Sequence, residues 1–302
     1  MLPLTPAAPP SSTGLFRLLQ TGMAVAIAFI AAAALAAPPP GDARRGEYLM
    51  KAAGCMGCHT AETKGAAPFA GGRELKTPFG TFFGPNITPH AQAGLGRWTE
   101  ADFVRAMRDG RRPDGGHYFP AFPYPSFTKM TDEDLKNLWA FMRMIPPNSQ
   151  ASREHELKFP FGFRPLVLAW KWLFFTPGAD PVNPKLTPVQ ARGAYLVNAL
   201  GHCGECHTPR NFMGGPNKAR LLAGTKKGPD GKGVPNITPA SLKKWGDGEL
   251  KEFLVGGMTP DGDVPAESMG EVIRNTTSQI TPQDLAAMIA YLRAVPAVAS
   301  EN

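Results

Sequence analysis

The sequence predicts a mainly α-helical protein with two similar domains, each made of short helices and loops. The 33 glycines and 32 prolines among 302 residues leave little room for long helices or a regular sheet. The hydrophobic share of 43% is enough for two separate cores. Two stretches of the chain carry the same motifs in the same order, so we expect an internal duplication to relate the domains.

Residues 1–37 are predicted to be a signal peptide or an N-terminal membrane anchor. Arg17 precedes the uncharged run "TGMAVAIAFIAAAALAA", which closes with an Ala-x-Ala pattern at 34–36. This order is typical of an export signal. The run is slightly short for a membrane span, which needs about 20 residues. Both alternatives predict that the rest of the chain is exported to a periplasm.

The repeat covers residues 38–147 and 187–302, which we predict to be the two domains. The stretch "RGEYLMKAAGCMGCHT" (45–60) returns as "RGAYLVNALGHCGECHT" (192–208) with one residue inserted. "PNITP" also occurs once in each copy. Each copy closes with a predicted helix, "TDEDLKNLWAFMRMIPP" and "TPQDLAAMIAYLRAVP". Both helices begin with threonine and acidic residues and stop at proline, as helix boundaries require.

Residues 148–186 match neither copy and are predicted to be a linker. This segment contains the aromatic-rich stretch "PLVLAWKWLFF" (165–175), which is too short and too interrupted to span a membrane. Two interpretations stay open. The linker either packs its aromatic side chains across both domains or forms a docking patch for a membrane or a partner subunit.

The four cysteines form two clusters, Cys55/Cys58 and Cys203/Cys206, each followed directly by a histidine. Three other uses of the cysteine pairs fit less well. A redox dithiol would be expected in a βαβ context, and a zinc site needs four ligands. A disulfide across so short a loop stabilises little. Haem attachment explains every element, because two thiols bond the porphyrin vinyl groups and the histidine ligates iron. We therefore predict two covalently bound haem c groups, with His59 and His207 as proximal iron ligands.

With these motifs, both halves resemble class I c-type cytochrome domains. The resemblance implies that a proline carbonyl accepts the other imidazole proton, and Pro85 and Pro235 in "PNITP" match that position. An ordinary turn is the alternative for these prolines. Trp98 and Trp245 are expected either to donate to haem propionates or to be core residues.

The resemblance places Met269 at the sixth ligand position of the second haem, with Met258 as the competitor. Superposing the copies through their shared "PDG" sets Phe122 opposite Met269, and phenylalanine cannot ligate iron. The first haem then has three alternatives: Met130 as ligand, His117 as ligand, or an open iron. Methionine raises the reduction potential of a haem and closes its far side.

The function that the resemblance implies is single-electron transfer. "PNITP", "GRWTEADF" and "YFPAFPYPSFTKM" are similar to cytochrome subunits of periplasmic alcohol, aldehyde or gluconate-type dehydrogenases, many of which carry three haems and a methionine where Phe122 stands. The implied partners are a dehydrogenase catalytic subunit and a downstream cytochrome, quinone or oxidase, with no catalysis by this chain alone. The alternative is a dihaem enzyme of peroxidase or thiosulfate-oxidising type with an open first haem.

The net charge and the predicted export signal bear on nucleic-acid binding and on the location of the protein. The net charge of +7 is modest, and no basic run is interleaved with aromatic residues, so the sequence does not predict nucleic-acid binding. We expect the protein in the periplasm, and attachment to the outer face of the inner membrane is an open alternative.

Overall fold

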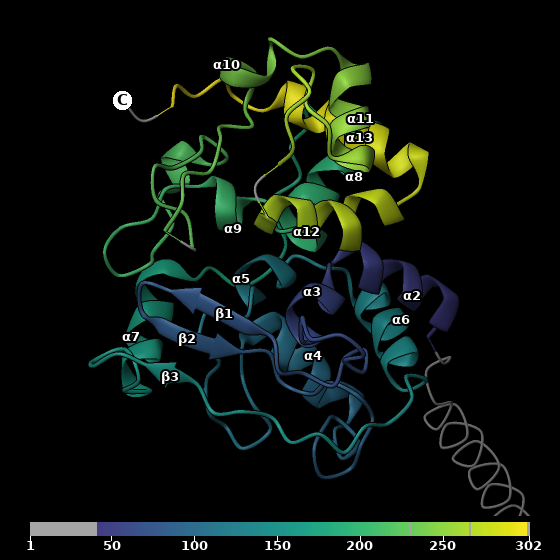
Figure 1. The fold of residues 1–302 in the computed structure, drawn as a ribbon, viewed down its shortest axis with the longest axis vertical. Helices are drawn as coiled ribbons and strands as arrows, with labels where there is room; N and C mark the ends of the chain where they lie inside the picture. Colours follow the sequence, from purple (N-terminus) through teal and green to yellow (C-terminus); the bar gives the residue numbers. More distant parts are fainter. Residues whose placement is uncertain (1–40, 230, 266, 301–302) are drawn as a thin grey trace, which may run out of the picture. The chain divides into compact units, whose positions relative to one another are not determined.

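Each copy begins and ends with a helix, and the two helices cross. The computed structural model describes residues 41–229, 231–265 and 267–300, so the predicted signal or anchor at 1–37 lies outside the described residues. The crossing pairs are α2 (Ala43–Ala52) with α6 (Asp132–Met142), and α8 (Pro188–Tyr195) with α13 (Pro282–Ala294) (Figure 1).

Shorter elements and loops fill the space between these helices. The first copy contains α3 (Cys55–His59), β1 (Glu74–Thr77), β2 (Gly80–Phe83), α4 (Glu100–Asp109) and α5 (Tyr124–Phe127). The linker contains β3 (Glu156–Leu157) and α7 (Pro165–Phe174). The second copy contains η1 (Leu196–Leu200), α9 (Gly204–His207), η2 (Lys218–Arg220), α10 (Pro239–Leu242), α11 (Asp247–Gly256), α12 (Glu267–Asn275) and η3 (Thr277–Gln279). The predicted mainly helical fold is confirmed.

The closing helices begin at the predicted threonines. The Thr131 hydroxyl accepts a hydrogen bond of 3.1 Å from the Asp134 backbone N–H at the start of α6. Thr281 caps α13 in the same way through Asp284, at 3.2 Å. These caps satisfy amide groups that the first turn of a helix leaves without partners.

A glycine in each opening helix allows the crossing helices to touch backbone to backbone. A Cβ atom on Gly46 would lie 1.9 Å from the carbonyl oxygen of Asn137, and one on Gly193 would lie 1.9 Å from that of Ala287. Both separations are far below van der Waals contact, so no larger residue fits without moving the helices apart. Leu49 and Leu135 are fully buried beside the first crossing.

The residue inserted in the second copy is absorbed by a π-helical turn. α8 continues into η1, a π-helix over Leu196–Leu200, before the second cysteine cluster. A π turn accommodates one extra residue without ending the helix. The second cluster therefore still follows its opening helix directly.

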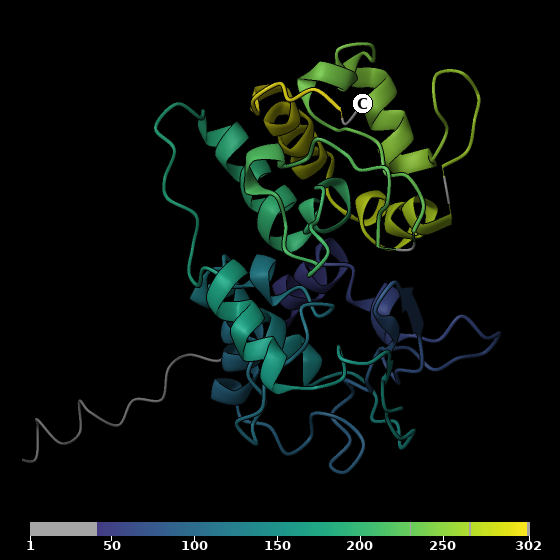
Figure 2. The ribbon, with the colours of Figure 1, turned by 90° about the vertical axis from the view of Figure 1, so that its left-hand side faces the viewer.

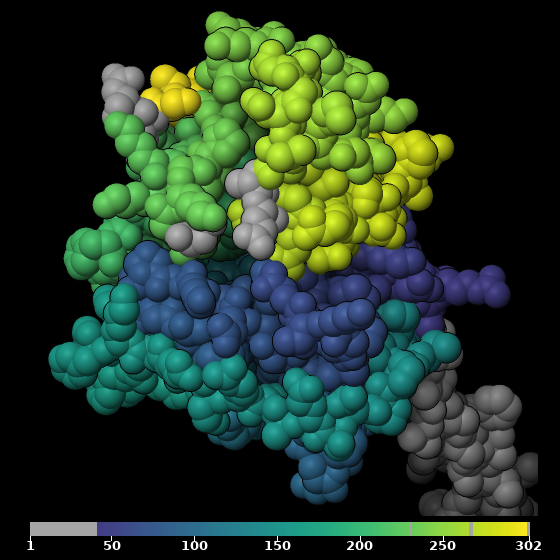
Figure 3. Space-filling model, in the orientation of Figure 1, coloured from purple at the N-terminus to yellow at the C-terminus, as the bar shows by residue number. Residues whose placement is uncertain are grey.

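The two copies contact each other through reciprocal tyrosine–aspartate hydrogen bonds. Tyr195 in the second copy donates to Asp134 in the first at 2.7 Å, and Tyr48 in the first donates to Asp284 in the second. Each aspartate is also held by an arginine of its own copy, Asp284 by Arg192 at 2.7 Å. The same residues thus make the contact from both sides, as in a two-fold symmetric dimer. Figure 3 shows the copies directly against each other.

The linker packs onto both copies, and it completes a small sheet that the sequence did not predict. β1 pairs with β2 as an antiparallel hairpin, and β3 adds to β2 with Gly80 opposite Leu157. From α7, the indole N–H of Trp170 donates to the Met213 carbonyl of the second copy at 3.1 Å. Lys171 donates to the Asp109 carbonyl of the first copy. Within the described ranges, no helix is long and apolar enough to cross a membrane.

The glycine crossing gives a prediction for stability. Gly46→Ala is expected to lower the free energy of unfolding by about 2–3 kcal/mol, because the new methyl group overlaps a backbone carbonyl. Gly248→Ala in the first turn of α11 is the matched control and should not lower stability, since nothing lies within 4 Å of a Cβ there and alanine is the better helix former. Urea unfolding followed by circular dichroism measures both. Equal effects of the two substitutions would contradict the contact.

The aspartate cluster gives a prediction for pH dependence. Burial alone would raise the pKa of Asp284, but the hydrogen bonds from Arg192 and Tyr48 outweigh it and hold that pKa below its ordinary value. The stabilisation is therefore fully present above the ordinary carboxyl pKa, about 4, and is lost as the pH falls through the lower folded-state value. Asp284→Asn should lower stability at neutral pH and flatten its loss in acid. Unchanged acid dependence in thermal unfolding scans would count against the cluster.

Candidate haem-binding sites

Each cysteine–histidine cluster lies on a short helical turn directly after the opening helix of its copy. α3 carries the first cluster and follows α2 through Gly54, whose positive φ of 62° turns the chain sharply. α9 carries the second cluster and follows η1. In the described part of the chain, none of the four cysteines forms a disulfide. Each turn therefore presents two thiols and one imidazole close together.

Both histidines contact the proline carbonyls named from the sequence. Nδ1 of His59 lies 2.8 Å from the carbonyl oxygen of Pro85, and Nδ1 of His207 lies 2.7 Å from that of Pro235. A carbonyl only accepts, so Nδ1 carries the proton and the lone pair of Nε2 stays free for a metal. Burial lowers the pKa of both imidazoles, against the opposing effect of the proline hydrogen bonds. Both rings are therefore neutral at neutral pH, as a ligand must be.

The asparagines of "PNITP" tie down the loop directly after each proline, a role that the sequence analysis missed. Asn86 accepts hydrogen bonds from the N–H and hydroxyl of Thr88, and its amide donates to the Asn148 carbonyl at 2.9 Å. Asn236 repeats the arrangement with Thr238 and donates to the Val298 carbonyl at 2.7 Å. The signal was present, because the whole five-residue motif repeats, not the proline alone.

Three of the four thiols are held in the protonated form, which does not favour redox exchange. Burial, the largest effect, raises the pKa of Cys55 to about 12, of Cys58 to about 11 and of Cys203 to about 12. A reactive dithiol needs a lowered thiol pKa. Within the part of the chain that the structure describes, no three His, Cys, Asp or Glu side chains are grouped as a metal site.

The two candidates for the far side of the first site lie in different surroundings. Met130 is 1% exposed and packs in the core immediately before the cap of α6. His117 is half-buried, and its Nδ1 lies 3.0 Å from the Nζ of Lys171 in α7. An ammonium group only donates, so Nδ1 of His117 accepts and the proton of the neutral ring sits on Nε2. Phe122 packs edge-on against Tyr118, with ring centroids 5.4 Å apart.

In the second copy the corresponding segment is longer. It runs from Gly257 to Thr281, whereas the first copy runs from Gly110 to Thr131. The longer segment forms α12, and the half-buried Met269 lies on this helix. The gapless superposition of Phe122 on Met269 thus pairs a residue of a loop with a residue of a helix.

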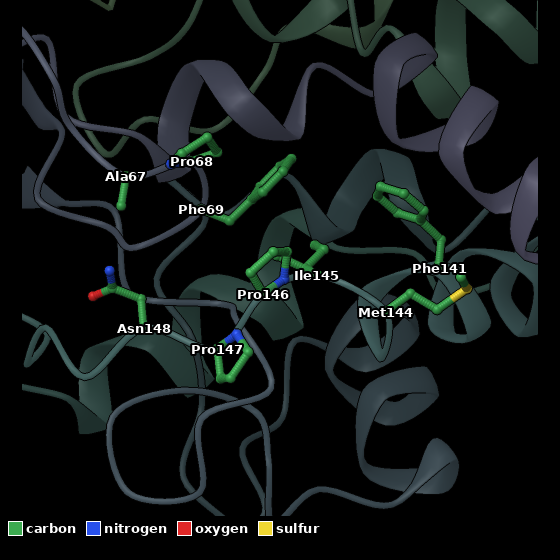
Figure 4. A pocket seen from close by; sticks show the side chains of 9 residues that line it. All are labelled: Ala67, Pro68, Phe69, Phe141, Met144, Ile145, Pro146, Pro147 and Asn148. Atoms are coloured by element: carbon green, nitrogen blue, oxygen red, sulfur yellow. The ribbon is translucent and has the colours of Figure 1, made fainter.

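The pocket in Figure 4 borders the loop that carries Pro85: its lining residue Asn148 accepts a hydrogen bond from the Asn86 side chain through its carbonyl. It has a volume of about 270 Å³ between residues 67–69 and 144–148, and Asn148 is the polar residue among its lining side chains. None of its lining residues was predicted to bind a cofactor, and none carries a charge.

A comparison with known families assigns the repeat. The model of the cytochrome c family matches residues 43–146 and 190–296, one match in each copy. The chain belongs to the cytochrome c family. Two such domains, with the cysteine pairs Cys55/Cys58 and Cys203/Cys206, imply two haem c groups in this cytochrome.

Known relatives of the cytochrome are dihaem proteins and dehydrogenase subunits. It is 45% identical over 262 residues to a diheme cytochrome c-type protein of Cereibacter sphaeroides, covering 85% of this chain and 87% of that protein. It is 38% identical to the fructose dehydrogenase cytochrome subunit of Gluconobacter japonicus and 37% identical to an alcohol dehydrogenase (quinone) cytochrome c subunit of Gluconacetobacter polyoxogenes. These matches cover 88% and 93% of this chain, but only 56% and 62% of the two subunits.

Other polar groups of the cytochrome also fit a haem. In the described part of the chain, the indole N–H groups of Trp98 and Trp245 have no hydrogen-bond partner in the protein, although both side chains pack against the core. The hydroxyl of Tyr124 is fully buried and likewise without a partner there. Of these three groups, the Tyr124 hydroxyl is the buried one, and buried polar groups are rarely left unsatisfied, so an additional polar group is expected beside Tyr124. Haem propionates supply such acceptors.

The clusters give a prediction for haem content. Cys203→Ala combined with Cys206→Ala should leave one covalently bound haem per chain, because each haem is attached only through the thiols of its own cluster. Cys55→Ala combined with Cys58→Ala is the matched variant and should give the same value. The pyridine haemochrome spectrum of denatured, acid-extracted protein measures it. Loss of both haems from a folded variant, or of neither, would contradict the assignment.

Proposed function

We propose that this dihaem cytochrome is a periplasmic electron carrier that serves as the electron-transfer subunit of a dehydrogenase. It receives electrons from a separate catalytic subunit and passes them to a quinone, cytochrome or oxidase of the respiratory chain, without catalysis of its own. The relatives named as cytochrome subunits of alcohol and fructose dehydrogenases support this proposal. The export signal expected at 1–37 supports the location.

The observation that carries the proposal is the position of both attachment turns at the contact between the copies. In α3, a Cβ on Gly57 would lie 3.2 Å from the Glu271 carboxylate of α12 in the second copy. In α9, Glu205 accepts a hydrogen bond of 3.2 Å from Ser126 of α5 in the first copy. Each cluster thus faces the other domain. This arrangement favours passage of an electron from one domain to the other.

The chain's residues hold and orient the redox group. Haem c, when bound, supplies a one-electron couple between ferric and ferrous iron. Cys55 and Cys58 would hold the first group and Cys203 and Cys206 the second. The proline carbonyls keep the rings of His59 and His207 in one orientation and one tautomer, and the hydrogen bond raises their basicity as ligands.

We assign Met269 as the sixth ligand of the second site and Met130 as that of the first. Met130 is favoured over His117 because the contact with Lys171 places the His117 proton on the nitrogen that would face a metal. Met130 has no competing polar contact from its thioether and is fully enclosed in the core. Met258, the competitor in the second copy, is 62% exposed.

Carbon monoxide binding tests both ligands. The dithionite-reduced wild-type protein should not bind carbon monoxide, because both irons are closed on each side. Met269→Ala and Met130→Ala should each make one of the two haems bind it, seen as a shift of part of the ferrous Soret band. Met258→Ala is the control and should behave as wild type.

Binding by one haem of the wild-type protein would refute the assignment of Met130. It would also promote the alternative of an enzyme with an open first haem. An unchanged spectrum of Met130→Ala, together with binding by His117→Ala, would instead identify His117 as the ligand.

Electron transfer itself is tested with the reduced protein alone. Mixed anaerobically with ubiquinone-1, it should give up two electrons per chain and then stop. It should not consume hydrogen peroxide or thiosulfate catalytically. Sustained turnover of either substrate without a partner would contradict the carrier function.

A further inference from the structure

Helix α7 of the linker buries its charged residue and exposes large apolar side chains, the reverse of an ordinary surface helix. Its inward face buries Val167 and Trp170 together with Lys171, the only charged residue of the helix. Its outward face carries Leu168, Trp172 and Leu173, which are 57%, 87% and 56% exposed. α7 lies at the left of Figure 1 and faces the viewer in Figure 2, where no other helix or strand covers it.

The chain leading into α7 extends this apolar surface. Phe159 is 95% exposed, Phe163 is 60% exposed, and Phe161 and Leu166 are also exposed. We define the aromatic face as these residues together with the outward side chains of α7: Phe159, Phe161, Phe163, Leu166, Leu168, Trp172 and Leu173. A soluble surface rarely gathers so many large apolar side chains in one short segment unless something covers them.

The charges within the segment that carries the aromatic face are all positive. Residues 157–179 contain Lys158, Arg164 and Lys171 and no aspartate or glutamate. Lys158 and Arg164 are exposed, and each donates to a backbone carbonyl, that of Pro78 and that of His117, both at 3.2 Å. Carbonyl partners do not neutralise a cation, so both side chains keep their positive charge at an exposed position.

We propose that the aromatic face binds the surface of an anionic lipid bilayer, with α7 lying in the plane of the interface. A short helix with Trp, Phe and Leu on one side and basic residues beside it is the pattern of an interfacial helix. Tryptophan is enriched where hydrocarbon meets headgroups, and lysine and arginine attract anionic headgroups. Trp172 is 87% exposed and Phe159 95% exposed, and side chains that free of protein contacts can enter the space between lipid headgroups.

The proposal goes beyond electron transfer and does not depend on it. The exposed cations and the exposed Trp172 favour a membrane over a partner subunit as the occupant. A catalytic subunit seated on this face is the outcome that the following test is designed to detect.

Site-directed spin labelling tests the proposal on the full-length holoprotein. The four native cysteines are held as thioethers, so Trp172→Cys introduces a single reactive thiol for a nitroxide. Val264→Cys, at a position 80% exposed in the second copy, is the matched control. The haems are kept oxidised, because reductants also reduce a nitroxide, and vesicles of phosphatidylglycerol and phosphatidylcholine in equal parts are added. Collision of each label with oxygen and with a water-soluble nickel chelate is then compared.

We expect the ratio of oxygen to nickel collisions to rise severalfold at position 172 and to stay unchanged at 264. Since the readout is local, membrane binding by residues 1–37 does not produce it. No change at 172, or equal changes at both positions, would overturn the proposal. So would immobilisation of the 172 label by a dehydrogenase catalytic subunit but not by vesicles. Electron transfer is not measured, so failure here leaves the carrier function untouched.

A second measurement uses the unlabelled protein. Leu168→Ser combined with Trp172→Ser should weaken sedimentation with the same vesicles by about tenfold or more, because two large apolar groups no longer leave water. Val264→Ser should leave sedimentation unchanged, and vesicles of phosphatidylcholine alone should bind the wild type more weakly. Equal binding by the double variant and the wild type would overturn the proposal.

Discussion

The backbone contact at Gly46, repeated at Gly193, is the constraint on which the rest of each domain depends. Because the helices touch there, the direction of the opening helix is fixed, and the cysteine cluster leaves its end at a defined place. Chains so rich in glycine and proline bury few side chains per turn. A close helix crossing together with a covalently held cofactor compensates for this, since small cores alone give marginal stability.

Both copies have the same helix crossing, and the two copies contact each other through equivalent residues. The opening helices carry Tyr48 and Tyr195 outward, and each reaches the aspartate in the first turn of the other copy's closing helix. The aspartates sit there because acidic residues favour helix N-termini, so one sequence feature serves both the helix and the contact between domains. The reciprocity indicates that the duplicated domains meet as two identical subunits would.

Much of this could be predicted from the sequence, because the decisive signals are local. The cysteine–histidine clusters and the threonine caps are short motifs whose geometry follows from spacing, and the proline partners were implied by the resemblance to class I c-type cytochromes. The β1–β2–β3 sheet was not predicted, since its last strand is two residues of the linker that pair only through tertiary contact. The Tyr48–Asp284 contact joins residues far apart in sequence, and no spacing reveals it. The sequence shows that one residue is inserted before the second cluster, but only the structure shows that the π turn at Leu196–Leu200 accommodates it.

The central claim is that the two domains form one path for electrons. Flash photoreduction with less than one electron per chain, followed by freeze-quench electron paramagnetic resonance of the two ferric signals, tests it directly. The account predicts that the electron moves from one site to the other at a rate independent of protein concentration. A rate that rises in proportion to concentration, or no redistribution between the sites, would contradict it.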